Sequence, residues 1–315
     1  MQVPGLGVVA RRGARRLLAA PRTTPDEAGL TPALDALGGE VVRLRARDGL
    51  RLAGRWLVAE PAAREDGAWT PDPHEAVLLL HGWSGSIAPD LVEYGSFLRR
   101  TAGVLGLDLR GHGRSDDGPT TFGLQETEDV AGAVSWLGDR GVTRVALFGT
   151  SMGGIVAIAA TAVLGEGTFT APDADVFAPT VTSAPRPRIV AIVADAVSPE
   201  LRVLVGSRLP RLARGFMADR VLDAAERQLG EDPRSLEPMR TLPLLEGMPV
   251  LLIHGESDER VPIREGRRLA AVPGPATEHW TVSGAGHSGA HRAAPEAYEQ
   301  RVGAFLRGAF IAARG

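Results

Sequence analysis

A serine lies at the centre of the segment Gly149-Thr150-Ser151-Met152-Gly153. Apolar residues 145–148 precede it, as in a short buried strand, and the Ala-rich apolar run 155–164 follows it, as in a buried helix. A Gly-X-Ser-X-Gly segment between a strand and a helix is typical of a nucleophile elbow, a sharp turn that exposes the serine hydroxyl. The alternative is a serine without a catalytic role in a glycine-rich turn. Such turns are common in a chain with 39 glycines. The flanking elements favour a nucleophilic role for Ser151.

A nucleophilic serine needs a base to remove its proton, and a carboxylate to orient that base. Asp258 follows the apolar run 250–253 directly, so we expect it at the same sheet edge as Ser151. Asp195, just past the apolar run 189–193, is the alternative acid. His287 lies in a glycine-rich segment after the last expected strand, from which its ring can reach Ser151. Of the seven histidines, His291 is the nearest rival to His287 as the base.

Acyl transfer also requires two backbone N–H donors that stabilise the oxyanion. We expect one from Met152, the residue after the nucleophile, and one from Trp83, in the His81-Gly82-Trp83 segment that ends the apolar run 76–80. The Trp83 indole, Leu204 and Phe216 are the candidate substrate-binding side chains.

The elements around these residues alternate between strand and helix from residue 76 onward, which predicts an α/β fold. Two earlier strands flank Asp48-Gly49, a strong hairpin signal.

Residues 1–38 are expected to be an N-terminal extension, and 39–315 a single domain. Residues 198–247 are too long for a simple crossover and carry apolar residues at helical spacing. We interpret them as a helical lid insertion, with ordinary packing helices as the alternative. The proline-rich stretch 165–188 is expected to be a loop.

Composition narrows the classes of function. A net charge of -3 gives no reason to expect a nucleic-acid partner. The chain has no cysteine, which excludes disulfides and thiolate metal sites, and no lysine, which excludes Schiff-base chemistry through that residue. No apolar run approaches the roughly 18 residues that span a bilayer. We expect a cytoplasmic protein without a metal or cofactor. Arginines 11, 12, 15, 16 and 22 leave open a membrane-surface helix, against the simpler interpretation of a solvated helix or frayed tail.

Taken in chain order, these motifs resemble those of the α/β-hydrolase superfamily over roughly residues 40–313. They comprise the His81-Gly82-Trp83 segment, residues 108–115, the Ser151 elbow, the Asp258 loop and Gly286-His287. The serine aminopeptidase, prolyl-oligopeptidase-like and small bacterial esterase branch is the most similar. The resemblance implies a mostly parallel eight-stranded sheet with helices on both faces and strand 2 antiparallel. It also implies a cofactor-free mechanism through an acyl-enzyme on Ser151.

Three hypotheses about function follow. The first is a hydrolase of small-molecule carboxylic esters, where an apolar lid and little charge around the motifs favour small to medium acyl chains. The second is a peptidase, aminopeptidase or thioesterase; a peptidase needs a carboxylate for the substrate amine, and Asp90, Glu93 and Glu200 are candidates. The third is a non-catalytic binding protein on the same fold, which the complete set of motifs argues against.

Overall fold

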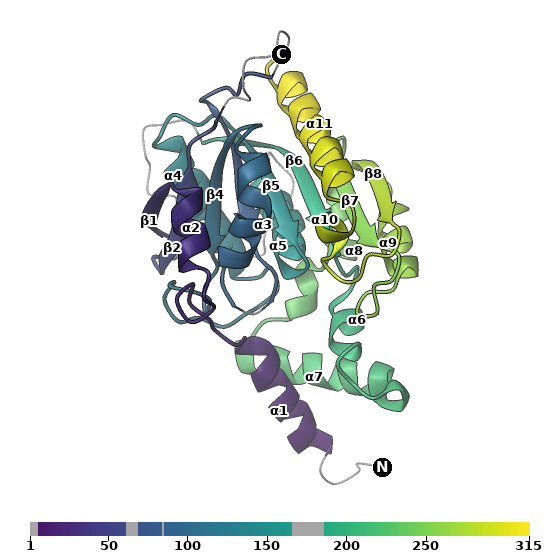
Figure 1. The fold of residues 1–315 in the computed structure, drawn as a ribbon. Helices are drawn as coiled ribbons and strands as arrows, with labels where there is room; N and C mark the ends of the chain where they lie inside the picture. The colour runs from purple at the N-terminus through teal and green to yellow at the C-terminus, as the bar shows by residue number, and fades with distance from the viewer. Residues whose placement is uncertain (1–5, 61–68, 84, 166–185) are drawn as a thin grey trace.

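The structure is a computed structural model, and it describes residues 6–60, 69–83, 85–165 and 186–315. Most of the loop expected at 165–188 lies outside these residues. The described chain folds into a central sheet with helices on both faces and a smaller helical lobe at one end (Figure 1).

The sheet has eight strands in the order β1-β2-β4-β3-β5-β6-β7-β8. Strand β2 is antiparallel to both of its neighbours, and the remaining pairs are parallel. This confirms the predicted mostly parallel sheet and its antiparallel strand. The strands are Glu40–Arg45, Arg51–Leu57, Glu75–Leu80, Gly103–Asp108, Arg144–Thr150, Arg188–Asp195, Pro249–Gly255 and Ala276–Val282, numbered β1 to β8.

The central strands are apolar runs because both faces of the sheet are covered. In β3, Leu78 and Leu80 point to one face, while Val77 and Leu79 point to the other. Helices α4, α5 and α9 cover the first face, and α2, α3, α10 and α11 cover the second. These helices are α2 Thr31–Leu37, α3 Ala88–Leu98, α4 Glu126–Gly138, α5 Met152–Leu164, α9 Ile263–Ala270, α10 Ala290–Ala293 and α11 Pro295–Ala313.

The predicted helical insertion lies between β6 and β7. It contains α6 Leu201–Gly206, α7 Arg214–Leu229, α8 Pro238–Thr241 and the 3-10 helices η2 Arg211–Ala213, η3 Pro233–Leu236 and η4 Leu242–Leu244. We call residues 198–247 the lid insertion. Helices α6 and α7 form part of the smaller lobe below the sheet in Figure 1.

The N-terminal segment differs from the solvated helix or frayed tail that the sequence favoured. Residues Leu6–Leu18 form α1, which packs against α7 of the lid insertion (Figure 1). The small residues Ala10 and Ala14 are buried in this contact, and a Cβ on Gly13 would lie 2.8 Å from Val221 Cγ2. The close approach of the two helices thus depends on small side chains. The arginines of α1 remain on its outer face.

Candidate active site

Ser151 lies at the turn between β5 and α5, in the unusual backbone conformation of φ 50° and ψ -108°. A non-glycine residue at such angles costs about 1–3 kcal/mol, and the surroundings must enforce it. A Cβ on Gly149 would lie 2.2 Å from the backbone of Gly153, and one on Gly153 would lie 2.1 Å from Leu80 O. The two glycines are therefore required by contact between backbones, and the predicted sharp turn is present.

The three side chains selected from the sequence meet at this turn. His287 Nε2 lies 3.0 Å from Ser151 Oγ, and His287 Nδ1 lies 2.8 Å from Asp258 Oδ2. The carboxylate can accept only from an Nδ1–H, so Nε2 is left free to accept the serine hydroxyl proton. The arrangement can therefore activate the Ser151 hydroxyl as a nucleophile.

Asp258 is held in place by the loop that follows β7. Its Oδ1 accepts hydrogen bonds from the backbone amides of Arg260 and Val261, both at 2.9 Å, and its side chain is fully buried. Burial alone disfavours the charged carboxylate. The hydrogen bond and charge of His287, with the Val261 amide, outweigh burial and lower the pKa of Asp258 below its usual value. An ionised Asp258 is the form that orients an imidazole.

The loop that carries His287 has a brace that the motifs did not reveal. Ser288 has a positive φ of 50°, and its carbonyl accepts a hydrogen bond from Arg292 at 2.8 Å. The other guanidinium nitrogen of Arg292 contacts Glu93 on α3 at 2.6 Å. Because Glu93 and Arg292 lie 199 positions apart, no local sequence signal could pair them. The brace fixes the backbone next to His287.

The loop after β3 packs directly against the serine. A Cβ on Gly82 would lie 3.6 Å from Ser151 Cβ. His81 is fully buried and accepts a hydrogen bond from the Leu109 amide through Nε2 at 3.1 Å. Burial, with the nearby His112, lowers the pKa of His81 to about 3, so its ring is neutral and orders the loop. Met152 is the first residue of α5, where amides have no partner within the helix.

The candidate substrate-binding residues differ in exposure, and Arg208 contacts two of them, the Trp83 ring and the Leu204 carbonyl. Trp83 is half-buried, and its indole N–H donates to Leu17 O of α1 at 3.1 Å. Leu204 is buried in the core of the lid insertion. Phe216, in contrast, is 56% exposed and lies under the guanidinium of Arg220. Phe216 precedes the buried Met217 on α7 and so points away from the packed face.

The alternative acid and base lie away from the Ser151 hydroxyl. Asp195 is buried at the end of β6, where its Oδ2 accepts from the Tyr298 hydroxyl at 2.9 Å. His291 lies between Glu93 and Glu299, at 3.4 Å from each. The backbone carbonyl of Asp195 accepts a hydrogen bond from the Ser151 amide at 2.7 Å, but among the side chains only His287 contacts Ser151 Oγ and only Asp258 contacts His287 Nδ1.

The carboxylates considered for binding a substrate amine are mostly engaged. Glu93 pairs with Arg292, and Glu200 pairs with Arg268 at 2.5 Å. Asp90 accepts from the Thr150 hydroxyl at 2.7 Å, and burial raises its pKa to about 7. Within the described ranges, no three His, Asp or Glu side chains are grouped to hold a metal ion. No helix in those ranges is both long and apolar enough to cross a membrane.

Comparison with known proteins identifies the family of this chain. The model of the Alpha/beta hydrolase family matches residues 77–301, which include all three side chains of the site. The chain belongs to this family. Among curated proteins, the uncharacterized protein YfhR of Escherichia coli (strain K12) is 25% identical over 240 residues, covering 76% of this chain and 69% of YfhR.

Solved esterase structures share the fold of this alpha/beta hydrolase. The Pyrococcus furiosus esterase Pf2001 superposes with a TM-score of 0.64 at 23% identity, covering 93% of this chain and 98% of that one. The esterase of Exiguobacterium antarcticum superposes with a TM-score of 0.55 at 16% identity, covering 85% of this chain and 100% of that one. At these identities the likeness concerns the fold.

Proposed function

We propose that this alpha/beta hydrolase cleaves carboxylic esters of small to medium acyl chain, with Ser151 as nucleophile, His287 as base and Asp258 as orienting acid. The observation that carries the proposal is the unbroken series of hydrogen bonds from Ser151 Oγ through His287 to Asp258, at 3.0 and 2.8 Å. The esterase neighbours add support at the level of the fold.

In the proposed reaction, Ser151 Oγ attacks the ester carbonyl while His287 Nε2 takes the hydroxyl proton. The backbone amides of Trp83 and Met152 stabilise the oxyanion. Collapse of the tetrahedral intermediate expels the alcohol, which takes the proton from His287, and leaves an acyl group on Ser151. A water molecule, deprotonated by His287, then attacks the acyl-enzyme and releases the carboxylic acid and free Ser151.

The engaged carboxylates favour esters over peptides. A substrate amine would compete with Arg292 for Glu93 or with Arg268 for Glu200. Competition with a charge-assisted hydrogen bond worth about 1.5–3 kcal/mol weakens amine recognition at either position.

The test is hydrolysis of p-nitrophenyl esters from acetate to decanoate by the wild type, Ser151→Ala and the control Ser96→Ala, which changes an exposed serine on α3. We expect a chain-length optimum in the wild type and in Ser96→Ala, and a loss of at least 10⁴-fold in Ser151→Ala. Labelling by a fluorophosphonate should require Ser151. An unlabelled wild type without turnover would refute the proposal, whereas labelling without ester turnover would redirect it to peptides or thioesters.

A further inference from the structure

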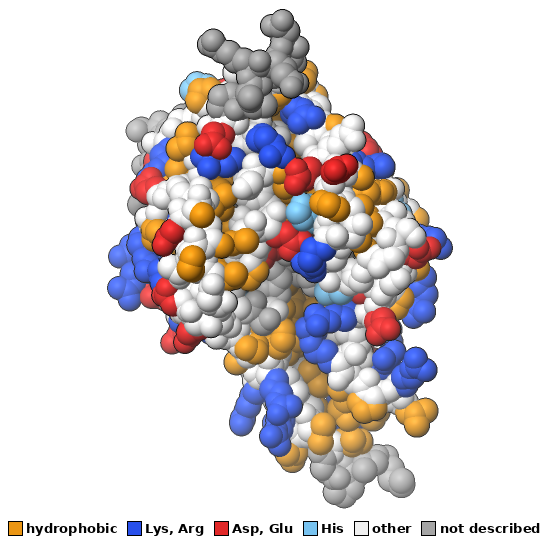
Figure 2. Space-filling view, viewed as in Figure 1, with side chains coloured by type: hydrophobic (Ala, Val, Ile, Leu, Met, Phe, Trp, Pro, Cys, Tyr) orange, Lys and Arg blue, Asp and Glu red, His pale blue; other side chains and the backbone are white. Residues whose placement is uncertain are grey.

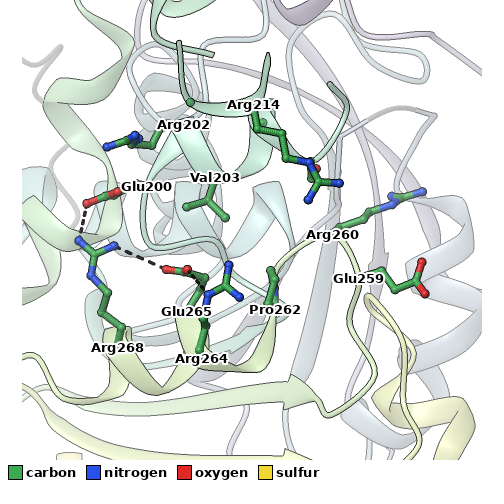
Figure 3. A pocket seen from close by; sticks show the side chains of 13 residues that line it. Glu200, Arg202, Val203, Arg214, Glu259, Arg260, Pro262, Arg264, Glu265 and Arg268 are labelled. Atoms are coloured by element: carbon green, nitrogen blue, oxygen red, sulfur yellow. Dashed lines mark hydrogen bonds and ion pairs between the residues drawn. The ribbon is translucent and has the colours of Figure 1, made fainter. Parts of the chain in front are cut away.

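A pocket of about 340 Å³ lies between the lid insertion and the loop that carries Asp258 (Figure 3). Its walls come from α6, the start of α7, the segment after Asp258 and helix α9. Five arginines and three glutamates line it, namely Arg202, Arg214, Arg260, Arg264, Arg268, Glu200, Glu259 and Glu265. Its volume suits a small ligand, and its composition departs from the low charge expected around the motifs.

The charges on one wall of the pocket are paired. Arg268 contacts Glu200 at 2.5 Å and Glu265 at 3.5 Å, and Figure 3 shows both contacts on the same side of the pocket. Arg264 contacts Glu265 at 3.1 Å. These pairs leave little net charge on that wall.

The opposite wall carries arginines without acidic partners. Neither Arg214 nor Arg260 has a carboxylate within 4.0 Å among the residues that the structure describes, and both extend to the same side of the pocket in Figure 3. Within the described residues, the Arg214 guanidinium makes one hydrogen bond, a long one from Nε to Leu209 O at 3.4 Å. In Figure 2, basic side chains gather where the lower lobe meets the main body. Glu259 lies on the same side of the pocket as Arg260, so Arg214 and Arg260 together leave that side with a net positive charge.

Arg208 adds a third positive charge next to this wall. Burial lowers the pKa of its guanidinium, and the nearby charge of Arg260 lowers the pKa further. No carboxylate lies within ion-pair distance of Arg208 in the described part of the chain. Like charges held close together repel each other, and an anion placed between them relieves that repulsion.

Both ends of this positive surface connect to the candidate active site. The backbone amide of Arg260 donates to the Asp258 carboxylate at 2.9 Å. The Arg208 guanidinium lies 4.6 Å from the centre of the Trp83 ring, and Gly82, the residue before Trp83, packs on Ser151. Arg260 therefore lies next to the Asp258 loop, and Arg208 next to the loop that packs on Ser151.

We propose that Arg208, Arg214 and Arg260 form an anion-binding subsite, so that the ester substrate carries a carboxylate or phosphate group away from the scissile bond. The proposal rests on the proposed function, because the subsite selects among esters. Guanidinium groups bind carboxylates and phosphates through charge-assisted, often bidentate hydrogen bonds. The anion can belong to the acyl half or to the leaving group of the substrate.

Matched ester pairs measure the preference. For the acyl half, mono-(4-nitrophenyl) adipate is compared with its neutral methyl ester. For the leaving group, 4-(butyryloxy)benzoate is compared with its methyl ester. We expect the wild type to favour the anionic member of one pair in kcat/KM. Arg260→Gln and Arg214→Gln should each reduce kcat/KM for the anionic ester by about tenfold, the loss expected for one charge-assisted hydrogen bond. The kcat/KM for the neutral ester should stay within about twofold of the wild type.

The control is Arg211→Gln, which changes an exposed arginine of the lid insertion that does not line the pocket. This variant should leave kcat/KM unchanged for both esters of each pair. A phosphate-specific subsite would appear as a preference for butyryl-coenzyme A over S-butyryl-N-acetylcysteamine with the same dependence on Arg260. The subsite proposal would be overturned if the arginine variants lost kcat/KM equally on the charged and neutral esters, or if the wild type preferred the charged ester in no pair. Either result would leave the esterase proposal intact.

Anion binding is also measured without catalysis. Calorimetric titration of Ser151→Ala with glutarate and with inorganic phosphate should give binding that Arg260→Gln weakens about tenfold and Arg211→Gln does not change. If neither anion binds, or if Arg260→Gln binds as tightly as its parent, the subsite proposal is wrong even where no test ester turns over.

Discussion

Replacement of Asp195 by Asn should make stability less sensitive to pH. Asp195 is fully buried, its Oδ2 accepts from Tyr298, and its Oδ1 has no hydrogen-bond partner in the structure as described. Burial raises the pKa of Asp195 from 3.8 to about 7; the charges of Glu93 and Asp258 add to the rise, while the Tyr298 hydrogen bond and Arg292 oppose it. The folded state therefore holds this proton more tightly than the unfolded state does.

The sign and size of the effect follow from that difference. The contribution of Asp195 to the free energy of unfolding is greatest below pH 3.8. It falls as the pH rises to about 7, where its loss is complete. Each pKa unit is worth about 1.36 kcal/mol, so the full loss is about 4 kcal/mol, of which about 3 kcal/mol falls between pH 5 and pH 8. Asparagine does not ionise and keeps an oxygen that can accept from Tyr298.

Urea unfolding at pH 5 and pH 8 measures this effect. Any packing cost of Asp195→Asn is the same at both pH values, so the variant should gain about 3 kcal/mol relative to the wild type on moving from pH 5 to pH 8. The control Asp139→Asn changes an exposed carboxyl at the end of α4 and should show no such gain. An equal difference between Asp195→Asn and the wild type at both pH values would refute the reasoning.

Three further predictions concern the site and its supports. Asp258→Asn should lower kcat on p-nitrophenyl butyrate by about 10⁴-fold, because the amide can donate to Nδ1 and favour the wrong tautomer of His287; an effect under tenfold would contradict the assigned role. Gly153→Ala places a Cβ 2.1 Å from Leu80 O and should cost about 3 kcal/mol in urea unfolding, with Gly308→Ala, where a Cβ meets nothing within 4 Å, as the tolerated control. Gly13→Leu should separate α1 from α7, seen as faster amide hydrogen exchange in both helices; exchange confined to α1 would count against the packing described.

The sequence predicted the sheet and identified the three side chains that meet at the turn after β5, because both depend on local patterns. Apolar runs of strand length identified the parallel strands, and their carboxyl ends meet at one edge, which brought Ser151 and Asp258 together. The elbow glycines were informative because their replacement would produce backbone clashes. Element ends moved by a few residues, as in the strand expected at 145–148, which runs from Arg144 to Thr150.

What the sequence did not predict depends on distant pairing or on weak patterns. Helix α1 packs through Ala10 and Ala14, whose small side chains give little hydrophobic signal against many arginines. The outward direction of Phe216 depends on which face of α7 meets α1, which no spacing within α7 reveals. Whether a carboxylate of the described residues lies within 4.0 Å of Arg260 depends on segments far apart in the sequence, which no local pattern reveals.

The contact between α1 and α7 also has a consequence for synthesis of the protein. Helix α1 leaves the ribosome first, but its partner on α7 begins about 200 residues later. At about 5–20 residues per second, α1 waits on the order of 10–40 s for that surface. During this time its inner face is exposed, and the small alanines there offer little area to wrong partners. The contact between α1 and α7 can therefore form only after residue 229 has been translated.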